Sequence, residues 1–522
     1  MSFKLTYATM FNPPEALHEG FEKALAKVQA RLGARHPHFI DGADVATGQS
    51  MTLRSPIDHD WVLGEFDVAS VGEAVAALRA AHAAFPGWRR TPVDERARLM
   101  RKVADLLEGR VYELSAALVL EVGKNRMEAL GEAQETVDFF RHYADDMERH
   151  AGFDHPLPND PLPGVVSTNR SVMRPHGAWV VIVPFNYPLA LAGGPVAAAL
   201  VTGNTVVLKG SQYTPWAGRL LADCLRDAGV PKGVFHYLSG AGADVGAALA
   251  AHPLCAGLTF TGSVAAGKQL IATMTGAAWP RPAIAEMGGK NPCIVTRHAD
   301  LDAAAAGIAR SAFGMGGQKC SALSRVYVDG AVADALVDRL KQQAAAVRVG
   351  DPTRRENWLG PVIHAASYAR FTQYVEELVA GGARIHAGGR VLREGALARG
   401  YYVEPTLAEA PAAHPLWQHE MFVPLLMLQR VKDREEAMRL ANDTAMGLTA
   451  GFYGGKDEVA WFHEHIEAGV TYANRPQGAT TGAWPGYQPF GGWKGSGSTG
   501  KAIASYYYLP LYLREQSRTV VE

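Results

Sequence analysis

The sequence predicts an α/β protein in which parallel sheets are covered by helices on both faces. From residue 179 onward, four short apolar segments of strand length each lead into a longer segment of helical period. A second series of alternating strands and helices follows Cys320. This alternation favours parallel sheets over antiparallel ones, because parallel strands need a crossover that is usually a helix. The 522 residues suffice for two or three domains.

Helices dominate the first 150 residues, after a short strand and turn at 39–42. In the second predicted helix, Thr91 is expected as the N-cap and Pro92 as the first helical residue. Its apolar residues, such as Leu99 and Val103, recur at helical spacing and fall on one face. The predicted helices cover residues 71–84, 91–109, 112–122 and 126–149.

The middle of the chain passes from a loop to an exposed strand and then to strand–helix units. Residues 155–164 carry too many prolines for a regular element, and residues 165–174 alternate like an exposed strand. Strands are then expected at 179–183, 205–209, 234–238 and 258–261, with helices starting at Pro188, Pro215, Ala243 and Val264.

Residues 177–208 contain no charged side chain, which on hydropathy alone resembles a membrane span. Pro184, Pro188 and Pro195 would break a single helix there, so we expect a buried strand, a turn and a helix instead. Further on, a strand at 324–328 and helices at 331–348 and 368–380 are expected. The alternating residues 504–521 predict a C-terminal strand that could pair with another subunit.

Composition narrows the functional class. The net charge is −1 and no long stretch is dominated by one sign, so neither nucleic acid nor a membrane surface is expected as a partner. The four cysteines show no CxxC spacing, so we expect no metal site, no disulfide framework and a reducing, cytoplasmic setting. The N-terminus also lacks the apolar core of a secretory signal.

One cysteine differs from the others in its surroundings. Cys320 follows Gln318 and Lys319 in a glycine-rich segment, whereas the other three lie in apolar segments typical of buried thiols. A thiol nucleophile together with a carboxylate that activates water could oxidise an aldehyde through a thioester, and Glu286 beside two glycines could be that carboxylate. The residues alone leave two non-catalytic interpretations open: Cys320 as a structural cysteine, and Glu286 as a solvated loop residue.

Asn186 and two glycine-containing turns point to a ligand cleft. Asn186 lies between a buried strand and a helix start, where its amide could stabilise an oxyanion or merely cap the helix. The turns at 240–246 and 260–263 each end a strand and begin a helix, so their backbone N–H groups could hold a pyrophosphate. The literal GxGxxG at 495–500 is rejected as a dinucleotide motif, because no strand leads into it.

Seven segments, in this order along the chain, make it similar to the aldehyde dehydrogenase superfamily. They are residues 184–188, 203–209, 260–263, 286–292, 317–320, 419–424 and 488–492. The resemblance implies a Rossmann-like parallel-sheet cofactor domain (1–150 and 173–287), a second α/β catalytic domain (288–485), and a small β flap for oligomerisation (151–172 and 500–522). The proline-rich hairpin region and the predicted C-terminal strand indicate a homodimer or higher homo-oligomer.

The resemblance implies roles for residues as well. Cys320 would attack the aldehyde, Asn186 and the Cys320 N–H would hold the oxyanion, and Glu286 would activate water after hydride transfer to the nicotinamide. Lys209 would bind the adenine ribose, Glu420 the nicotinamide ribose, and Phe422 would pack beside the ring. The full set expected around NAD is Pro184, Phe185, Lys209, Ser211, Gln212, Gly242, Gly246, Phe260, Gly262, Ser263, Glu420 and Phe422.

Within the superfamily, the chain most resembles the 1-pyrroline-5-carboxylate dehydrogenase subgroup, through residues 121–125, 317–322 and 478–479. That resemblance implies oxidation of L-glutamate γ-semialdehyde to L-glutamate, as in proline catabolism, with Ser321, Gly478 and Ala479 binding the α-carboxylate. The link at 481–487 is longer than the subgroup's. Neutral Gln212, where many members carry a glutamate that repels a 2′-phosphate, leaves NADP open as a cofactor.

Four rival hypotheses remain. The first is an aldehyde dehydrogenase of different or broader substrate range, and the second is a CoA-acylating relative, which the presence of Glu286 disfavours. The third is a cysteine hydrolase that needs no cofactor. From another class comes a non-catalytic binding protein with the same fold, although binding alone would not require both a nucleophile and a base.

Overall fold

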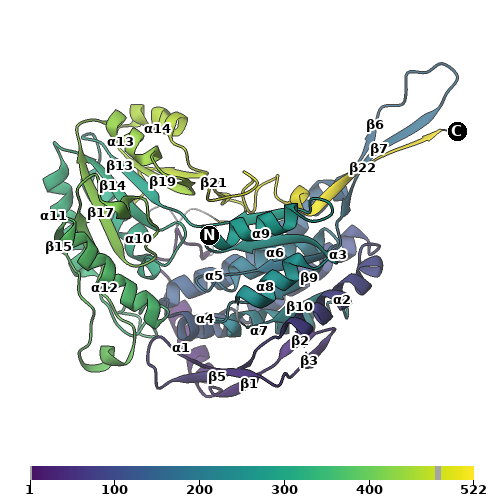
Figure 1. Ribbon diagram of the computed structural model, residues 1–522, viewed down its shortest axis with the longest axis horizontal. Helices are drawn as coiled ribbons and strands as arrows, with labels where there is room; N and C mark the ends of the chain where they lie inside the picture. Colours follow the sequence, from purple (N-terminus) through teal and green to yellow (C-terminus); the bar gives the residue numbers. More distant parts are fainter. Residues whose placement is uncertain (1–2, 241, 477–483, 522) are drawn as a thin grey trace.

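The computed structural model describes residues 3–240, 242–476 and 484–521. Two seven-stranded sheets form two α/β units, and a three-stranded sheet projects from them (Figure 1). The predicted α/β class with mostly parallel sheets is confirmed. Along the chain, Glu286 ends the last strand of the first sheet and Asn291 begins the first strand of the second, so four residues, 287–290, connect the two units.

The first sheet is parallel except at one edge. Four of its neighbouring strand pairs are parallel, whereas β2 runs antiparallel to β10, and β3 to β2. In spatial order its strands are β12 (Ala283–Glu286), β11 (Cys255–Thr261), β8 (Ala178–Ile182), β9 (Thr205–Lys209), β10 (Phe235–Leu238), β2 (His38–Ile40) and β3 (Ala43–Val45).

Helices cover this sheet on both faces, as the alternating pattern predicts. One apolar core lies under α2 (Val71–Trp88), α8 (Gly242–Ala251) and α9 (Val264–Thr275). The other core is larger and lies among α3 (Val93–Gly109), α4 (Val111–Val122), α5 (Arg126–Arg149), α6 (Ala190–Val201) and α7 (Pro215–Ala228). Every residue of β8 and β9 is buried, because both faces of these strands are covered.

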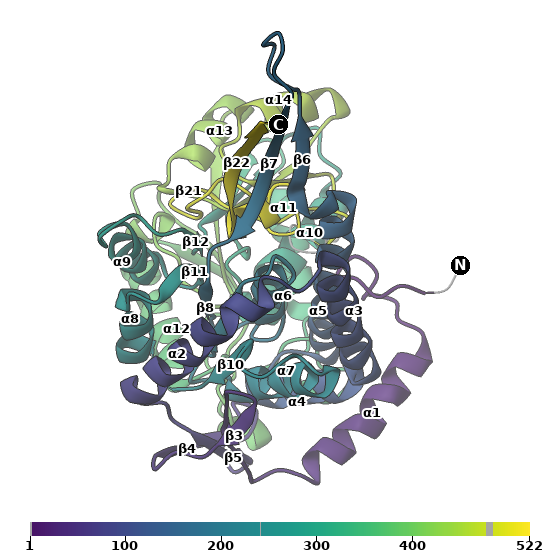
Figure 2. The same cartoon turned by 90° about the vertical axis from the view of Figure 1, so that its right-hand side faces the viewer.

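The uncharged residues 177–208 fold as β8, α6 and β9, so the strand–turn–helix prediction is confirmed. None of the helices within the described residues is long and apolar enough to cross a lipid bilayer. The N-cap prediction was wrong, since α3 starts at Val93 with Pro92 as N-cap and no side-chain cap. Sequence periodicity also missed the N-terminal helix α1 (Glu15–Gln29), which packs against α4 (Figure 2).

The second sheet is also parallel except for one edge strand, β15. In spatial order it consists of β15 (Arg384–Ala387), β16 (Thr406–Glu409), β17 (Leu425–Val431), β14 (Leu323–Asp329), β13 (Asn291–Val295), β19 (Thr449–Tyr453) and β20 (Val470–Ala473). One face packs on α10 (Leu301–Phe313) and α11 (Ala333–Ala346), and the other on α12 (Ala365–Ala380), α13 (Arg434–Asn442) and α14 (Val459–His465).

The projecting sheet joins segments that are distant in sequence: β22 (Leu513–Val521), β7 (Ser167–Pro175) and β6 (Asp154–Leu157), all antiparallel (Figures 1 and 2). Two predictions were wrong here. The proline-rich 155–164 segment does contribute a strand, and Pro156 is tolerated because β6 is an edge strand. Residues 504–512 are not a strand, because Tyr508 and Tyr512 are buried in the large core and the chain turns around them.

Shorter pieces complete the fold. A small sheet combines β1 (Ala34–His36), β5 (Val62–Asp67) and β4 (Ser50–Arg54), and β18 (Met446–Gly447) pairs with β21 (Trp493–Lys494). Residues 495–500, the rejected GxGxxG match, follow β21 directly and no helix begins there.

Candidate active site

The loop that carries Cys320 is held in a conformation that requires glycine. Met315, Gly316 and Gly317 all have positive φ, of 51°, 63° and 66°. A Cβ on Gly317 would lie 2.3 Å from the carbonyl oxygen of Val423, so only glycine permits this close approach. The loop thereby places Cys320 immediately before β14, beside the 420–423 segment.

Contacts from the 286–292 segment hold the backbone at and after Cys320. The Asn291 side-chain amide donates to the carbonyls of Cys320 at 2.7 Å and Ala322 at 2.9 Å. A Cβ on Gly289 would lie 2.4 Å from the Cys320 carbonyl oxygen, which explains that glycine of the 286–292 segment. Residues of the 286–292 segment therefore position the loop that carries Cys320.

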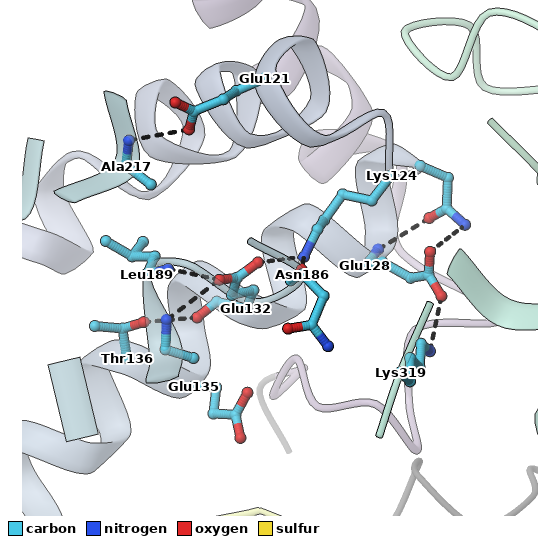
Figure 3. Close-up of polar contacts among 12 residues, drawn as sticks. Glu121, Lys124, Glu128, Glu132, Glu135, Thr136, Asn186, Leu189, Ala217 and Lys319 are labelled. Atoms are coloured by element: carbon cyan, nitrogen blue, oxygen red, sulfur yellow. Dashed lines mark hydrogen bonds and ion pairs between the residues drawn. The ribbon is translucent and has the colours of Figure 1, made fainter. Parts of the chain in front are cut away.

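Cys320 is partly exposed, whereas Cys224, Cys255 and Cys293 are buried, and all four are free thiols. Burial around the Cys320 sulfur, together with the nearby carboxylates of Glu420 and Glu286, raises its pKa to about 12. Lys319 does not offset this effect, because its ammonium pairs with Glu128 at 3.0 Å (Figure 3). The thiol therefore stays protonated at neutral pH in the free protein.

Asn186 lies in the loop between β8 and α6, and it does not cap α6. The first N–H groups of that helix, on Leu189 and Ala190, donate instead to Glu132 at 2.8 and 3.2 Å. The side-chain oxygen of Asn186 is buried and has no hydrogen-bond partner among the residues that the structure describes. The capping interpretation is excluded, and the amide is available to the cavity beside it.

Asn186, Cys320 and Ser321 line one cavity. Most of its surface is apolar or aromatic, and Glu135 and Lys319 are its charged lining residues. Gly478 and Ala479, expected to bind a carboxylate, lie outside the described residues. The described residues that line it are Tyr7, Glu135, Phe139, Asn186, Tyr187, Ala190, Leu191, Lys319, Cys320, Ser321, Trp484, Pro485, Gln488, Phe490, Ile503 and Ala504.

Glu286 is buried and is not a solvated loop residue. It ends β12 with 5% of its surface exposed, and its Oε2 accepts from the Gly492 N–H at 3.0 Å. Desolvation raises its pKa well above the usual value, only partly opposed by that hydrogen bond. Glu286 does not line the cavity of Asn186 and Cys320, but its charge acts on the Cys320 sulfur.

Glu420 and Phe422 approach Cys320 from the second unit. Glu420 Oε1 accepts from the Gly289 N–H at 2.9 Å, and a Cβ on Gly288 would lie 2.1 Å from its Oε2. Burial raises the Glu420 pKa to about 7. Phe422 has a positive φ of 58° and contacts Phe185 edge-on, with ring centroids 5.8 Å apart. The two aromatic rings thus meet where the two units face each other.

A second cavity of about 500 Å³ opens at the carboxyl ends of the first-sheet strands, within the range of small-molecule and cofactor sites. Nine of the twelve residues expected around NAD line it, whereas Glu420 and Phe422 do not; the surroundings of Gly242 lie outside what the structure describes. The nine are Pro184, Phe185, Lys209, Ser211, Gln212, Gly246, Phe260, Gly262 and Ser263. Sequence reasoning missed other lining residues, including Tyr213, Gln269 and Thr273.

Two features of this cleft fit a dinucleotide. Burial lowers the pKa of Lys209 to about 8, and none of the described residues is recorded as an acceptor for its ammonium, so a ribose hydroxyl could fill that position. The N-terminus of α9 faces the cleft beside Gly262, with Ser263 as its cap, and unsatisfied N–H groups there suit a phosphate.

Sequence reasoning also missed the buried charges behind the cavity (Figure 3). The Lys124 ammonium pairs with Glu132, donates to the Asn186 carbonyl at 2.7 Å, and lies 3.8 Å from the centroid of the Tyr187 ring. One turn earlier, Glu121 accepts from the first N–H groups of α7 at 2.5 and 3.0 Å. Glutamates at helical spacing beside Lys124 were the available signal for this network.

Comparison with known proteins agrees with this geometry. Residues 44–516 match the aldehyde dehydrogenase family model. A 1-pyrroline-5-carboxylate dehydrogenase from Geobacillus sp. strain WCH70 is 36% identical, over 97% of each chain, and one from Bacillus subtilis strain 168 is 35% identical over 96%.

Solved structures extend the comparison to the fold. The 1-pyrroline-5-carboxylate dehydrogenase from Thermus with bound NAD superimposes with a TM-score of 0.92, at 35% identity, over 100% of this chain and 99% of that one. The lactaldehyde dehydrogenase from Escherichia coli gives 0.86, at 32% identity, over 94% and 100%. This chain belongs to the aldehyde dehydrogenase family.

Proposed function

We propose that this enzyme oxidises L-glutamate γ-semialdehyde, which forms from 1-pyrroline-5-carboxylate, to L-glutamate with NAD or NADP, as in proline catabolism. The observation that carries the proposal is the joint placement of Cys320, Asn186 and Ser321 in one cavity. Relatives that share about 36% of their residues over nearly the whole chain carry the name of this activity, which supports the choice of substrate.

In the proposed reaction, the Cys320 sulfur loses its proton and bonds to the aldehyde carbon. Negative charge then develops on the aldehyde oxygen, where the Asn186 amide and the Cys320 N–H stabilise it. Asn186 lines the same cavity as Cys320, which supports its side-chain NH₂ as a donor to that oxygen. The free thiol's high pKa implies that a positive charge or a base must assist its deprotonation.

The nicotinamide, when bound, supplies the oxidant that accepts hydride from this adduct and leaves a thioester on Cys320. Lys209 and Glu420 would hold the two riboses, and the α9 N-terminus the pyrophosphate. Gln212 in the cleft is uncharged, so this chain presents no carboxylate at that position to repel a 2′-phosphate. Both NAD and NADP therefore belong in the proposal.

Glu286 then acts as the base for thioester hydrolysis. It takes a proton from water, the water oxygen bonds to the acyl carbon, and the Cys320 sulfur leaves as the carboxylate product forms. Its raised pKa suits this role, because a carboxylate with higher basicity accepts a proton more readily near neutral pH. At the substrate's other end, Ser321, Gly478 and Ala479 would bind the α-carboxylate.

The cavity also contains a candidate partner for the substrate's α-ammonium. Glu135 lines it, and burial raises its pKa to about 8. An ammonium placed beside this group would return the pKa toward its ordinary value and would pair with the carboxylate. A substrate with both an ammonium and a carboxylate fits this cavity better than a plain alkyl aldehyde.

A substrate panel tests the proposal. Reduced cofactor is followed by absorbance with glutamate semialdehyde, alkyl aldehydes of similar length, and each of NAD and NADP. We expect the highest kcat/KM for glutamate semialdehyde. Equal kcat/KM for the alkyl aldehydes would favour an aldehyde dehydrogenase of broader range, and ester hydrolysis without cofactor would favour the hydrolase.

The domains and the assembly belong to the same proposal. Residues 1–150 and 173–287 would form the NAD(P)-binding domain and 288–485 the catalytic domain, with the flap of 151–172 and 500–522 joining subunits into a homo-oligomer. Along β22 all residues after Leu513 are exposed, which supports a partner on that sheet. Four free cysteines support a reducing, cytoplasmic setting.

A further inference from the structure

We propose that the N-terminal segment, residues 3–12, forms one wall of the aldehyde cavity, and that Tyr7 limits which aldehydes reach Cys320. The inference rests on the proposed function only in taking this cavity as the aldehyde site. The segment precedes residues 44–516, which the aldehyde dehydrogenase family model matches. It is therefore an addition to the framework that the family model describes.

Tyr7 places its ring in the cavity wall. The side chain is 7% exposed and lines the same cavity as Asn186 and Cys320. Its ring meets Tyr187 and Trp484 edge-on, with centroids 6.2 and 5.1 Å apart. These three rings, contributed by sequence-distant segments, close the cavity on the side of the N-terminus.

Helix α5 is shaped to receive this ring. A Cβ on Gly131 would lie 2.8 Å from Tyr7 Cε1, so a larger residue at this helical position would displace the ring. One turn further along α5, the Tyr7 hydroxyl donates to Glu135 Oε2 at 2.5 Å. Tyr7 thus contacts the helix through both its ring and its hydroxyl, and it orients the carboxylate that faces the cavity.

The segment is anchored to both α/β units. Lys4 pairs with Asp138 at 3.2 Å, and the same carboxylate accepts from the Trp484 indole N–H at 2.7 Å. Phe11 lies under the Arg310 guanidinium of α10, 4.0 Å from ring centroid to Arg310 Cζ. Leu5 and Met10 are buried in a small apolar cluster with Tyr7, Leu130 and Trp484. Such anchoring is expected of a fixed wall and not of a frayed terminus.

The test compares access to Cys320 in the full-length enzyme and in Tyr7→Ala. The readout is the ratio of alkylation rates with N-phenylmaleimide and iodoacetamide, a bulky and a small reagent, measured without cofactor or substrate. The other three cysteines are buried, so the signal comes from Cys320. We expect Tyr7→Ala to raise the ratio at least about tenfold, because removing the phenol ring opens the wall.

Two further variants make the result decisive. Gly131→Ala displaces the ring without removing it and should raise the same ratio by a smaller factor, even if Tyr7→Ala fails to fold. The matched control, Tyr506→Ala, removes a tyrosine that is 64% exposed and should leave the ratio unchanged. A ratio equal to wild type in the folded Tyr7→Ala or Gly131→Ala protein would overturn the proposal.

Turnover gives a second, separable readout. The ratio of kcat/KM for 3-phenylpropanal to that for glutamate semialdehyde should rise in Tyr7→Ala. Tyr7→Phe keeps the ring but leaves Glu135 without its donor, so it should keep the wild-type alkylation ratio while raising KM for glutamate semialdehyde about tenfold. If wild-type enzyme does not oxidise glutamate semialdehyde, the function proposal fails, whereas the alkylation ratio still decides whether Tyr7 is the wall.

Discussion

Two sides of the Cys320 cavity treat buried charge in opposite ways. On the α5 side, two lysines lie in direct ion pairs: Lys124 pairs with Glu132, and Lys319 pairs with Glu128 at 3.0 Å (Figure 3). On the side formed by the chain's crossing between the two units, Glu286 is buried and Glu420 is partly buried. Within the described residues, each accepts one backbone hydrogen bond and neither forms a direct ion pair. The Lys290 charge lowers the pKa of Glu420 without such a pair, so direct pairing distinguishes the first side.

This difference in pairing suggests different roles for the two sides: the first fixes the backbone, and the second takes part in the reaction. Matched pairs are costly to break, so they fix the backbone that presents Asn186. The carboxylates and the thiol on the second side have pKa values raised by burial, as is typical of groups that exchange protons or attack a substrate. Each side can be tested by substituting one of its residues. Substitutions on the first side should change stability, and substitutions on the second should change reaction rates.

The largest effect is expected from the nucleophile. Cys320→Ala should abolish dehydrogenase turnover, because no sulfur remains to form the covalent adduct. The free energy of unfolding should change little, since the side chain is small and only partly buried. Steady-state cofactor reduction and a thermal melt are the measurements. Residual turnover above one part in a thousand, after exclusion of wild-type contamination, would contradict the covalent role.

Removing the base should slow the reaction without preventing the first turnover. Glu286→Gln should lower steady-state kcat by about 10²- to 10⁴-fold, the usual range for general base catalysis. A pre-steady-state burst of reduced cofactor should persist, because adduct formation and oxidation precede thioester hydrolysis. Stopped-flow absorbance separates the two phases, and a full steady-state rate would refute the assignment.

On the α5 side, breaking a buried ion pair should lower the stability of the protein strongly. Lys124→Met leaves Glu132 charged and buried without its partner, and should cost about 3–5 kcal/mol of unfolding free energy. The matched control is Arg98→Gln, which breaks the exposed pair with Asp94 on α3 and should cost at most about 1 kcal/mol. Denaturant titrations measure the free energy of unfolding of both variants. An equal loss in the two variants would show that the Lys124–Glu132 pair contributes no more to stability than the exposed pair.

The smallest effect is expected from Glu420 on the thiol. Above the Glu420 pKa of about 7, its negative charge opposes thiolate formation at Cys320, so Glu420→Gln should lower the Cys320 pKa. Iodoacetamide should then alkylate the variant up to about tenfold faster at pH 8–9, since one pKa unit is a tenfold change in thiolate fraction.

Below pH 6, Glu420 is neutral in the wild type, so both proteins should react at the same rate. A constant rate ratio from pH 5 to 9 would contradict a charge effect of Glu420 on the sulfur. These measurements are made without cofactor, so that any loss of cofactor contact in the variant does not enter the comparison.

Much of the fold followed from periodicity. The strands from 178 to 261 and the starts of the helices that follow them were predicted to within three residues, because apolar runs and glycine or proline breaks mark each one. The prediction was wrong where burial replaced pattern: residues 504–512 alternate like a strand, but Tyr508 and Tyr512 turn into the core. The short strand β6 was also not predicted, because proline argues against a strand except at the edge of a sheet.

The sequence by itself determined the fold class, the family and the residue types at Cys320, Glu286 and Asn186, because motif order and local periodicity are encoded in consecutive residues. Only the tertiary structure decided that Glu132, and not Asn186, caps α6, that Lys319 is paired away from the sulfur, and that Tyr7 reaches the cavity. Those facts depend on side chains that are brought together from distant segments. Likewise, burial raises the pKa of groups such as Glu286 and Cys320 only once the chain is packed.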